Sequence, residues 1–195
     1  MTADAVGFVV AGGRSRRMGE DKALLAWEGG TLLDHAIARL RTVCGEVRVL
    51  SGPEPRYADR GLPVDVDTLA DAGPLAGLAA ALAVAAPRAA VLLGVDMPFV
   101  TVALLAQVRD GLAGWDAAVP VTADGPEPLC AAYGPACLGP VREALAAGER
   151  RMTSFWGRVR VREMTADELA PLGAPERLFR NVNDPSEYAA ARAGA

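Results

Sequence analysis

Four cationic side chains lie close together near the start of this chain. The stretch VVAGGRSRRMGEDKALL, residues 9–25, contains Arg14, Arg16, Arg17 and Lys22, although the whole chain has a net charge of −4. Cations at this spacing repel one another unless an anion lies among them. Glycines that follow a strand let the backbone approach a ligand and expose N–H groups to phosphate. The stretch therefore predicts a site for a small, phosphate-bearing anion.

Two well-known phosphate-binding motifs do not fit this stretch. A Walker A loop needs Lys and then Ser or Thr directly after its last glycine, whereas Gly19 is followed by Glu20. The dinucleotide fingerprint G-x-G-x-x-G fails because Gly12 and Gly13 are adjacent. A phosphate-loop kinase is thereby excluded, and the pattern that remains is A-G-G-x-x-x-R-M-G-x-x-K.

Oxygen-bearing side chains elsewhere could bind a metal ion. Asp96 follows the apolar run AVLLGV, where a lone carboxylate is costly unless it is paired or binds a metal. Asn181 and Asn183 in RNVNDP lie on one face of an extended segment and offer neutral oxygen ligands or hydrogen bonds. Hard cations such as Mg²⁺ prefer these oxygens. The alternative role of Asn183 is an Asx turn before Pro185.

The remaining composition excludes several classes of protein. The single histidine, His35, cannot form a zinc site or a Ser/His/Asp triad and is interpreted as a packing or surface residue. None of the cysteines, Cys44, Cys130 and Cys137, has CxxC spacing, so neither a disulfide framework nor a zinc site is expected. The negative net charge argues against a general nucleic-acid binder. Without a signal peptide or an apolar run of about 20 residues, we expect a cytoplasmic protein that does not bind membranes.

The apolar pattern predicts strands that alternate with helices. The predicted strands are 6–11, 47–51, 62–66, 89–95, 117–121, 129–133 and an edge strand at 158–163. The predicted helices are 32–44, 75–86, 102–112 with Thr101 as its cap, 136–147 and 187–192. This alternation predicts an α/β fold with a mostly parallel sheet, in a single domain over residues 1–195.

Ligands of such sheets bind beyond the carboxyl ends of the parallel strands. Positions that directly follow apolar strands should therefore share one edge of the sheet. These positions are Gly12, Gly13, Ser51, Asp67 and Asp96. The pattern alone thus gathers glycines, a hydroxyl and two carboxylates beside the basic cluster.

The opening motif and four later segments resemble the molybdenum cofactor guanylyltransferases, a family of nucleotidyltransferases. The later segments are DTLADAGPLAGL (67–78), GVDMPFV (94–100), GPEPLCAAY (125–133) and RNVNDPSEY (180–188), in the family's order. The resemblance implies a Rossmann-like three-layer α/β/α sandwich of the nucleotide-diphospho-sugar transferase type. It also implies a nucleotide-binding half at about 1–100 and an acceptor-binding half at about 101–195.

The resemblance implies transfer of GMP from GTP to the terminal phosphate of molybdenum-molybdopterin, with Mg²⁺ as cofactor. The implied catalytic residues are Arg17, Lys22 and Asp96, and the implied metal ligands are Asp96 and Asn183. The implied nucleotide-binding residues are Val10, Ala11, Gly12, Gly13, Lys22, Ser51, Asp67, Gly77 and Asp96. The acceptor phosphate is expected to meet Asn181, Arg150 and Arg151, and an exposed helix end is the alternative for the two arginines.

The chemistry of these residues suits the reaction. Arg17 can offer a bidentate fork to phosphate oxygens, and Lys22 supplies a compact charge for the transferring phosphoryl group or pyrophosphate. Ser51 stands near the place where the family often has an Asn that contacts the nucleoside. No general base is required, because a phosphate nucleophile is already ionised near pH 7.

Other functions remain open at this point. The same reaction could use CTP or a sugar-phosphate acceptor, although the adjacent glycines favour guanine by resemblance. The chain could also be a non-catalytic, nucleotide-binding homologue. Transient contact with molybdoenzymes or their chaperones is expected from the resemblance alone.

Overall fold

The computed structural model describes residues 4–12, 21–66 and 73–193. Its strands are β1 (Ala5–Val10), β2 (Ala26–Trp27), β3 (Gly30–Thr31), β4 (Glu46–Leu50), β5 (Val64–Asp65), β6 (Ala89–Gly94), β7 (Ala117–Thr122), β8 (Gly125–Pro126), β9 (Cys130–Tyr133) and β10 (Val161–Met164). Its α-helices are α1 (Leu32–Val43), α2 (Pro74–Ala85), α3 (Val102–Asp110), α4 (Leu138–Ala146), α5 (Ala166–Leu169), α6 (Pro175–Leu178) and α7 (Pro185–Ala193). Short 3₁₀ helices include η1 (Lys22–Leu24) and η2 (Ala58–Arg60).

The main sheet has the strand order β10-β7-β9-β6-β1-β4-β5, and β8 pairs with β7 beside it. β1 pairs in parallel with both β4 and β6, and β10 pairs in parallel with β7. β9 is antiparallel to β6 and to β7. The sheet is therefore mostly parallel, as predicted, and it continues across the expected boundary near residue 100.

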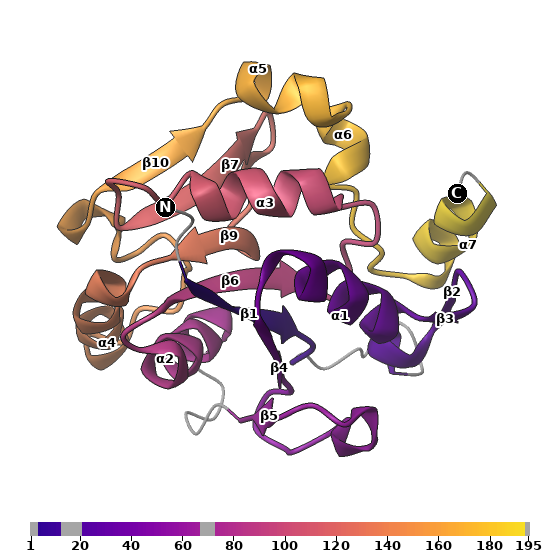
Figure 1. Cartoon of the computed structure of the whole chain (residues 1–195), viewed down its shortest axis with the longest axis horizontal. Coiled ribbons are helices and arrows are strands. Elements are labelled where there is room, and N and C mark those ends of the chain that lie inside the picture. The colour runs from indigo at the N-terminus through magenta and orange to yellow at the C-terminus, as the bar shows by residue number, and fades with distance from the viewer. Residues whose placement is uncertain (1–3, 13–20, 67–72, 194–195) are drawn as a thin grey trace.

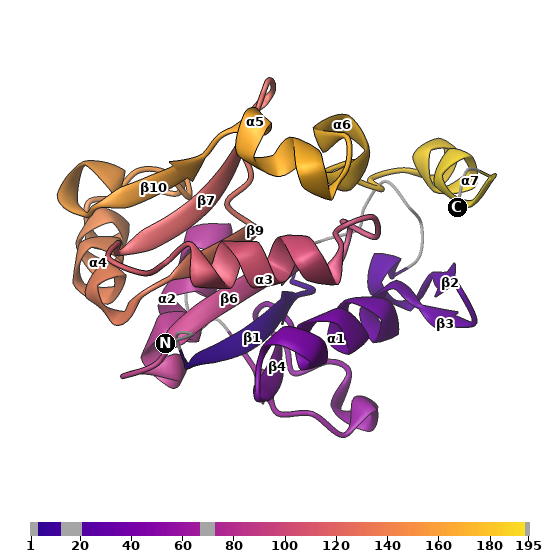
Figure 2. The ribbon, with the colours of Figure 1, turned by 45° about the horizontal axis from the view of Figure 1, so that its top comes forward.

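Helices cover both faces of this sheet, with α1 and α3 on one face and α2 and α4 on the other (Figure 1; Figure 2). Successive residues of β1 point into different cores because side chains alternate along a strand. Val9 belongs to the apolar core under α1 and α3, and Phe8 belongs to the core under α2 and α4. Both side chains are fully buried. The expected three-layer α/β/α sandwich is thus confirmed.

Side-chain caps explain where two of the helices begin. Thr31 and Asp34 form a capping box at α1: the Asp34 amide donates to Thr31 Oγ1, and the Thr31 amide donates to Asp34 Oδ2. Thr101 caps α3 by accepting a hydrogen bond from the Leu104 amide, as predicted. Both helices then bury aliphatic side chains against the sheet.

Several elements differ from the prediction. The expected strand 62–66 is reduced to the two residues of β5, and the expected edge strand 158–163 begins only at Val161. The hairpin β2–β3, the strand β8 that pairs with β7, and the helices α5 and α6 were not predicted. These elements have two to four residues each, which is too short for a hydrophobic period to be visible.

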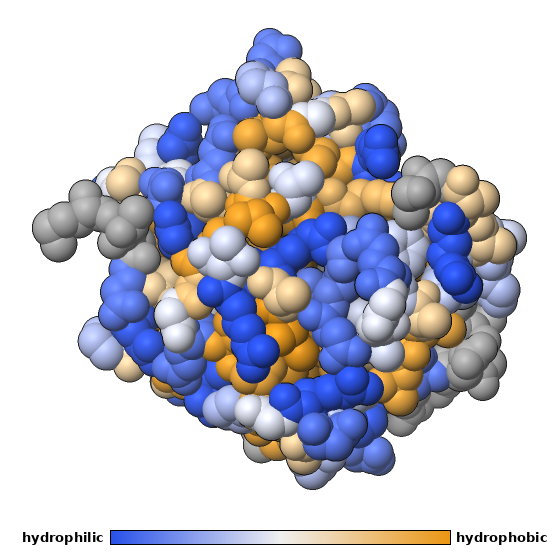
Figure 3. Space-filling model, turned by 45° about the vertical axis from the view of Figure 1, so that its right-hand side comes forward, coloured by the Kyte–Doolittle hydropathy of each residue, from blue (hydrophilic) through white to orange (hydrophobic). Residues whose placement is uncertain are grey.

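The surface mixes polar and apolar areas. Among the described residues, the exposed large apolar side chains are Leu24, Val84 and Trp115, which come from separate parts of the chain. Figure 3 shows orange, hydrophobic areas that are interrupted by blue, hydrophilic residues on the face in view. None of the helices in the described ranges is long and apolar enough to cross a membrane.

Candidate active site

The carboxyl ends of three parallel strands meet at one edge of the sheet. Val10, at the end of β1, is in register with Leu50 of β4 and with Gly94 of β6. The Ala11 amide donates to the Leu50 carbonyl at 2.9 Å, and the Val95 amide donates to the Val10 carbonyl at 3.1 Å. This pairing confirms that the residues that follow these strands, Gly12, Ser51 and Asp96, share one edge. Gly13 and Asp67 lie outside the described residues.

A glycine makes room for the carboxylate of Asp96. A Cβ atom added at Gly94 would lie 2.8 Å from Asp96 Oδ1 and 3.3 Å from the Met97 sulfur. The chain turns here, because the Met97 amide donates to the Gly94 carbonyl at 3.2 Å. The end of β6 thus holds Asp96 in space that any larger residue at position 94 would fill.

The turn after Asp96 is fixed from the α1 side of the sheet. Met97 is buried, and Phe99 packs edge-on against the buried Trp27, with 5.6 Å between the ring centroids. His35 Nε2 lies 3.1 Å from the Pro98 carbonyl oxygen. His35 is thus a packing residue, as interpreted from the sequence.

The C-terminal segment returns to the same turn. The Val182 amide donates to the Asp96 carbonyl at 2.9 Å, which brings Asn183 to the site. The predicted alternative role for Asn183, an Asx turn, belongs to its neighbour, because Asp184 Oδ1 accepts hydrogen bonds from the amides of Ser186 and Glu187 at the start of α7. The Asn183 side chain is therefore available to the site.

Lys22 joins these elements. Its ammonium donates to Asp96 Oδ2 at 3.2 Å and to Asn183 Oδ1 at 3.0 Å. The Lys22 side chain is 14% exposed and that of Asp96 is 26% exposed, so solvent screens this ion pair only partly. Lys22 is also the only lysine of the chain, whose other basic side chains are arginine, apart from His35. Three residues predicted as site residues thus lie together.

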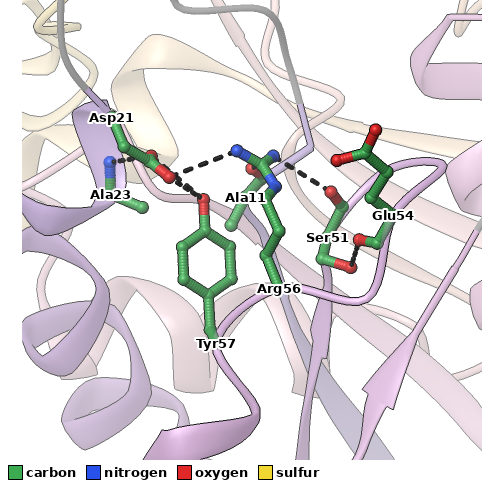
Figure 4. Close-up of polar contacts among 7 residues, drawn as sticks. All are labelled: Ala11, Asp21, Ala23, Ser51, Glu54, Arg56 and Tyr57. Atoms are coloured by element: carbon green, nitrogen blue, oxygen red, sulfur yellow. Dashed lines mark hydrogen bonds and ion pairs between the residues drawn. The ribbon is translucent and has the colours of Figure 1, made fainter.

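A second group of polar side chains surrounds Asp21, the residue before Lys22 in the sequence (Figure 4). This group was not predicted from the sequence. Asp21 accepts hydrogen bonds from the Tyr57 hydroxyl and from Arg56 Nη1, and we call these three residues the Asp21 cluster. Arg56 Nη2 also donates to the carbonyls of Ala11 and Ser51. No sequence pattern indicates these contacts, because GPEPRYADRG is typical of a turn-rich loop and has no hydrophobic period.

Glu127 is a further carboxylate at this edge that the prediction did not single out. It lies three residues before Cys130, which pairs with Leu93, and Asp96 lies three residues after Leu93. Both residues thus lie beyond the same end of this strand pair, and the charge of Asp96 acts on Glu127. Burial, together with the charges of Asp124 and Asp96, raises the pKa of Glu127 to about 7. The signal that could have found it is GPEPLCAAY, once β9 is known to run antiparallel to β6.

The structure places three more of the predicted nucleotide-binding residues, Ser51, Gly77 and Gly12. Ser51 is fully buried, and its hydroxyl donates to the Glu54 carbonyl at 2.6 Å, so the hydroxyl shapes its own loop rather than facing a ligand. Gly77 lies inside α2, where an added Cβ would meet none of the described atoms within 4 Å. Gly12 is different, because a Cβ there would lie 2.8 Å from the Gly52 amide nitrogen.

The remaining predicted residues either lie outside the described residues or, within them, form no hydrogen bond or ion pair with Lys22. Arg150 and Arg151 are exposed, and a Cβ at Gly73 would lie 3.8 Å from the Arg150 carbonyl oxygen. The two arginines thus stand near the start of α2, on the other face of the sheet from α1. The Asn181 side chain forms no hydrogen bond with the described part of the chain. Arg17 lies outside the described residues.

The oxygens of Asp96 and Asn183 suit a hard divalent cation whose coordination a substrate would complete. In the described ranges, no group of three or more His, Cys, Asp or Glu side chains is arranged to hold a metal ion. The oxygens of Asp96 and Asn183, however, already converge on one positive charge, the ammonium of Lys22. Mg²⁺ is commonly bound by one or two carboxylates together with phosphates and waters. Asp96 and Asn183 therefore suit such an ion.

Comparisons with known proteins show the family of this chain. The family model described as "MobA-like NTP transferase domain" matches residues 7–161. A "Probable molybdenum cofactor guanylyltransferase" from Pelotomaculum thermopropionicum is 36% identical over 188 residues, which cover 96% of this chain and 92% of that protein. The protein of the same name from Deinococcus radiodurans is 40% identical over 185 residues, which cover 93% and 90% of the two chains.

A solved structure has a similar fold. Molybdopterin-guanine dinucleotide biosynthesis protein A from Archaeoglobus fulgidus matches with a TM-score of 0.80 at 24% identity, over 96% of both chains. At this identity the likeness concerns the fold, and the family follows from the sequence matches. The chain therefore belongs to the MobA-like NTP transferases, the family of the proteins named molybdenum cofactor guanylyltransferase.

Proposed function

We propose that this protein transfers GMP from GTP to the terminal phosphate of molybdenum-molybdopterin, which yields molybdopterin guanine dinucleotide cofactor and pyrophosphate. The observation that carries the proposal is the convergence of Lys22, Asp96 and Asn183 at the edge of the sheet where β1 and β6 end. The names of the relatives at 36% and 40% identity support the choice of GTP and of the acceptor.

The proposed reaction is a displacement at phosphorus. An oxygen of the acceptor's terminal phosphate forms a bond to the α-phosphorus of GTP, and the bond from that phosphorus to the α–β bridging oxygen breaks. Pyrophosphate leaves with the electron pair. A phosphate monoester has its second pKa near 6, so no side chain has to remove a proton at pH 7. His35 is not needed as a base, and both of its ring nitrogens already have partners: Nε2 lies 3.1 Å from the Pro98 carbonyl oxygen, and Nδ1 lies 3.2 Å from Glu28 Oε2.

In this reaction Lys22 stabilises the negative charge that develops on the phosphates. A lysine ammonium is a compact charge on a flexible stem, so it can leave Asp96 and Asn183 and follow the phosphoryl group. Its occurrence as the only lysine in an arginine-rich chain supports this role. Arg17 is proposed as a second phosphate contact.

Asp96 and Asn183 are the residues that would hold Mg²⁺. When bound, the ion would neutralise phosphate oxygens and favour in-line attack. Gly94 and the Val182–Asp96 hydrogen bond fix the positions of the two ligands before substrate arrives. The acceptor is proposed to lie on the side of Asp96 where Glu127 stands, with Arg150 and Arg151 near its phosphate.

Calorimetric titration with GTP, CTP and ATP, each with Mg²⁺, tests the donor and the metal ligand. We expect GTP-selective binding that loses its Mg²⁺ dependence in Asp96→Ala and keeps it in Asp167→Ala, a change at an exposed carboxylate of α5. CTP selectivity would retain the reaction type and change the product. Binding of no triphosphate would overturn the proposal.

A second assay tests catalysis. We expect Mg²⁺-dependent release of pyrophosphate from GTP that requires molybdenum-molybdopterin. Nucleotide binding without this release would identify a non-catalytic nucleotide-binding protein instead.

A further inference from the structure

One guanidinium group connects both sides of the glycine-rich segment. Arg56 Nη2 lies 3.2 Å from the carbonyl oxygen of Ala11, which follows β1, and Arg56 Nη1 lies 3.2 Å from Asp21 Oδ2, which precedes η1. The same Nη2 lies 3.0 Å from the carbonyl oxygen of Ser51, which follows β4 (Figure 4). Arg56 therefore ties two strand ends to the start of η1.

The neighbouring residue holds the same carboxylate. The Tyr57 hydroxyl lies 3.0 Å from Asp21 Oδ1 and 2.8 Å from Asp21 Oδ2. The Tyr57 ring is buried, and the Arg56 guanidinium lies over it at 5.1 Å from the ring centroid. Tyr57 has a φ of +69°, a conformation that residues other than glycine rarely adopt. The fold thus keeps an unfavourable backbone conformation that directs this hydroxyl at Asp21.

Asp21 in turn positions the backbone of Lys22. Asp21 Oδ1 accepts a hydrogen bond from the Ala23 amide at 3.1 Å and caps η1, whose first residue is Lys22. The backbone that carries the lysine is therefore fixed by Asp21, and Asp21 is fixed by Arg56 and Tyr57. The charge of Arg56 is balanced by Asp21 within this cluster, which makes Arg56 a poor candidate for a direct phosphate ligand.

We infer that Arg56 and Tyr57 are positioning residues, which act through Asp21 to hold Lys22 and the two sides of the glycine-rich segment in the arrangement that receives the triphosphate. The inference rests on the proposed function. Its physical basis is preorganisation: groups that are already held in place lose less conformational entropy when the ligand binds.

Two substitutions test the inference on the whole chain. Tyr57→Phe removes only the hydroxyl, and Arg56→Lys keeps the charge but cannot reach all three acceptors. We expect each to raise the Kd for Mg–GTP about 10- to 100-fold, as for the loss of hydrogen bonds to a charged group, and to lower kcat as well. If Arg56 acted through its charge alone, Arg56→Lys would bind GTP like the wild type, and the inference would be wrong for Arg56.

Matched controls separate positioning from loss of stability. Arg109 also joins a carbonyl and a carboxylate, those of Val43 and Asp110, at the far ends of α1 and α3. Tyr133 donates its hydroxyl to the Pro128 carbonyl. We expect Arg109→Lys and Tyr133→Phe to lower the melting temperature by a similar amount without changing the GTP affinity. If the controls lost as much GTP affinity as Tyr57→Phe and Arg56→Lys, general destabilisation would explain the loss and the inference would be wrong.

A measurement without nucleotide keeps this inference distinct from the proposed function. Arg14, Arg16 and Arg17 are trypsin sites between Ala11 and Asp21, and mass spectrometry can follow their cleavage. We expect faster cleavage at these sites in Tyr57→Phe than in Tyr133→Phe. If the wild type binds no triphosphate, the proposed function fails while this difference still supports the holding role; equal cleavage rates in the two variants would refute it.

Discussion

The ammonium of Lys22 lies 3.2 Å from Oδ2 of Asp96, although 74 positions separate the two residues in the sequence. Asn183 Oδ1 lies 3.0 Å from the same nitrogen. A metal ion held by Asp96 and Asn183 would need the same two oxygens. On the proposed function, Lys22 and the metal ion would therefore compete for one place, and a lysine displaced from it would become available to the phosphates.

This competition predicts opposite effects of one substitution on metal binding and on catalysis. We expect Lys22→Met to bind Mn²⁺, a spectroscopic substitute for Mg²⁺, about 3-fold or more tightly than the wild type in the absence of nucleotide, because a positive charge is removed. Transfer activity should fall about 100-fold or more, as for the loss of a group that stabilises transition-state charge. Electron paramagnetic resonance of free Mn²⁺ measures the first effect, and weaker Mn²⁺ binding would contradict the competition.

The single lysine also predicts a selective chemical modification. Pyridoxal phosphate joins an aldehyde to a phosphate group, so it should bind at the phosphate site and form an imine that borohydride reduces on Lys22. We expect one labelled side chain, found in the peptide that contains residue 22, and protection by Mg–GTP. Labelling that Mg–GTP does not slow would place Lys22 outside the nucleotide site. Labelling of the α-amino group is distinguished by its peptide.

Substitution of two glycines by alanine, one in β6 and one in α2, should affect activity and stability differently. Gly94→Ala places a Cβ 2.8 Å from Asp96 Oδ1, so the carboxylate must shift, and we expect kcat/KM to fall about 10-fold or more. Gly77→Ala adds a methyl group inside α2 that would meet none of the described atoms within 4 Å, so we expect stabilisation of about 0.5 to 1 kcal/mol with unchanged activity. Urea unfolding and steady-state kinetics check both. A loss of GTP affinity in Gly77→Ala would instead mean that the nucleotide approaches this backbone, as the sequence predicts.

The features that could be predicted from the sequence depend on local patterns. The run Ala89–Gly94 is apolar throughout and is fully buried in β6, and Thr101 caps α3 as its type and place indicate. The alternation of strands and helices predicts a parallel sheet, in which the carboxyl ends of the strands share one edge. Gly12, Ser51 and Asp96 were therefore placed correctly at this edge without knowledge of any contact.

The features that could not be predicted depend on direction and on distant contacts. β9 is buried on both faces, so its apolar run carries no sign of direction; the short connection from Thr122 to Cys130 was the available signal, because a parallel partner needs a longer crossover. Tyr57 joins Asp21 across 36 positions from inside an irregular loop. No period or propensity specifies such a pair. The hydroxyl of Ser51 could likewise not be known to face Glu54 rather than a ligand.

The raised pKa of Glu127 predicts a pH-dependent loss of stability. Burial, then Asp124 and Asp96, raise the pKa of this carboxyl from 4.5 to about 7. Between these values the folded chain keeps a proton that the unfolded chain releases, so the free energy of unfolding falls as the pH rises from about 4.5 to 7 and stays lower above that. A shift of this size corresponds to about 3 kcal/mol, and partial exposure to solvent reduces the expected effect to about 1 to 2 kcal/mol.

Glu127→Gln isolates this effect, because the amide keeps the shape of the side chain and does not titrate. We expect the variant to match the wild type in urea unfolding near pH 4.5 and to be more stable by about 1 to 2 kcal/mol at pH 8. Glu163→Gln, at an exposed position of β10, should change stability equally at both pH values. A stability difference for Glu127→Gln that is the same at both pH values would mean that Glu127 titrates outside this window. If activity also falls in Glu127→Gln while GTP affinity is kept, the carboxylate acts on the acceptor side of Asp96, because a change on the nucleotide side would alter the GTP affinity as well.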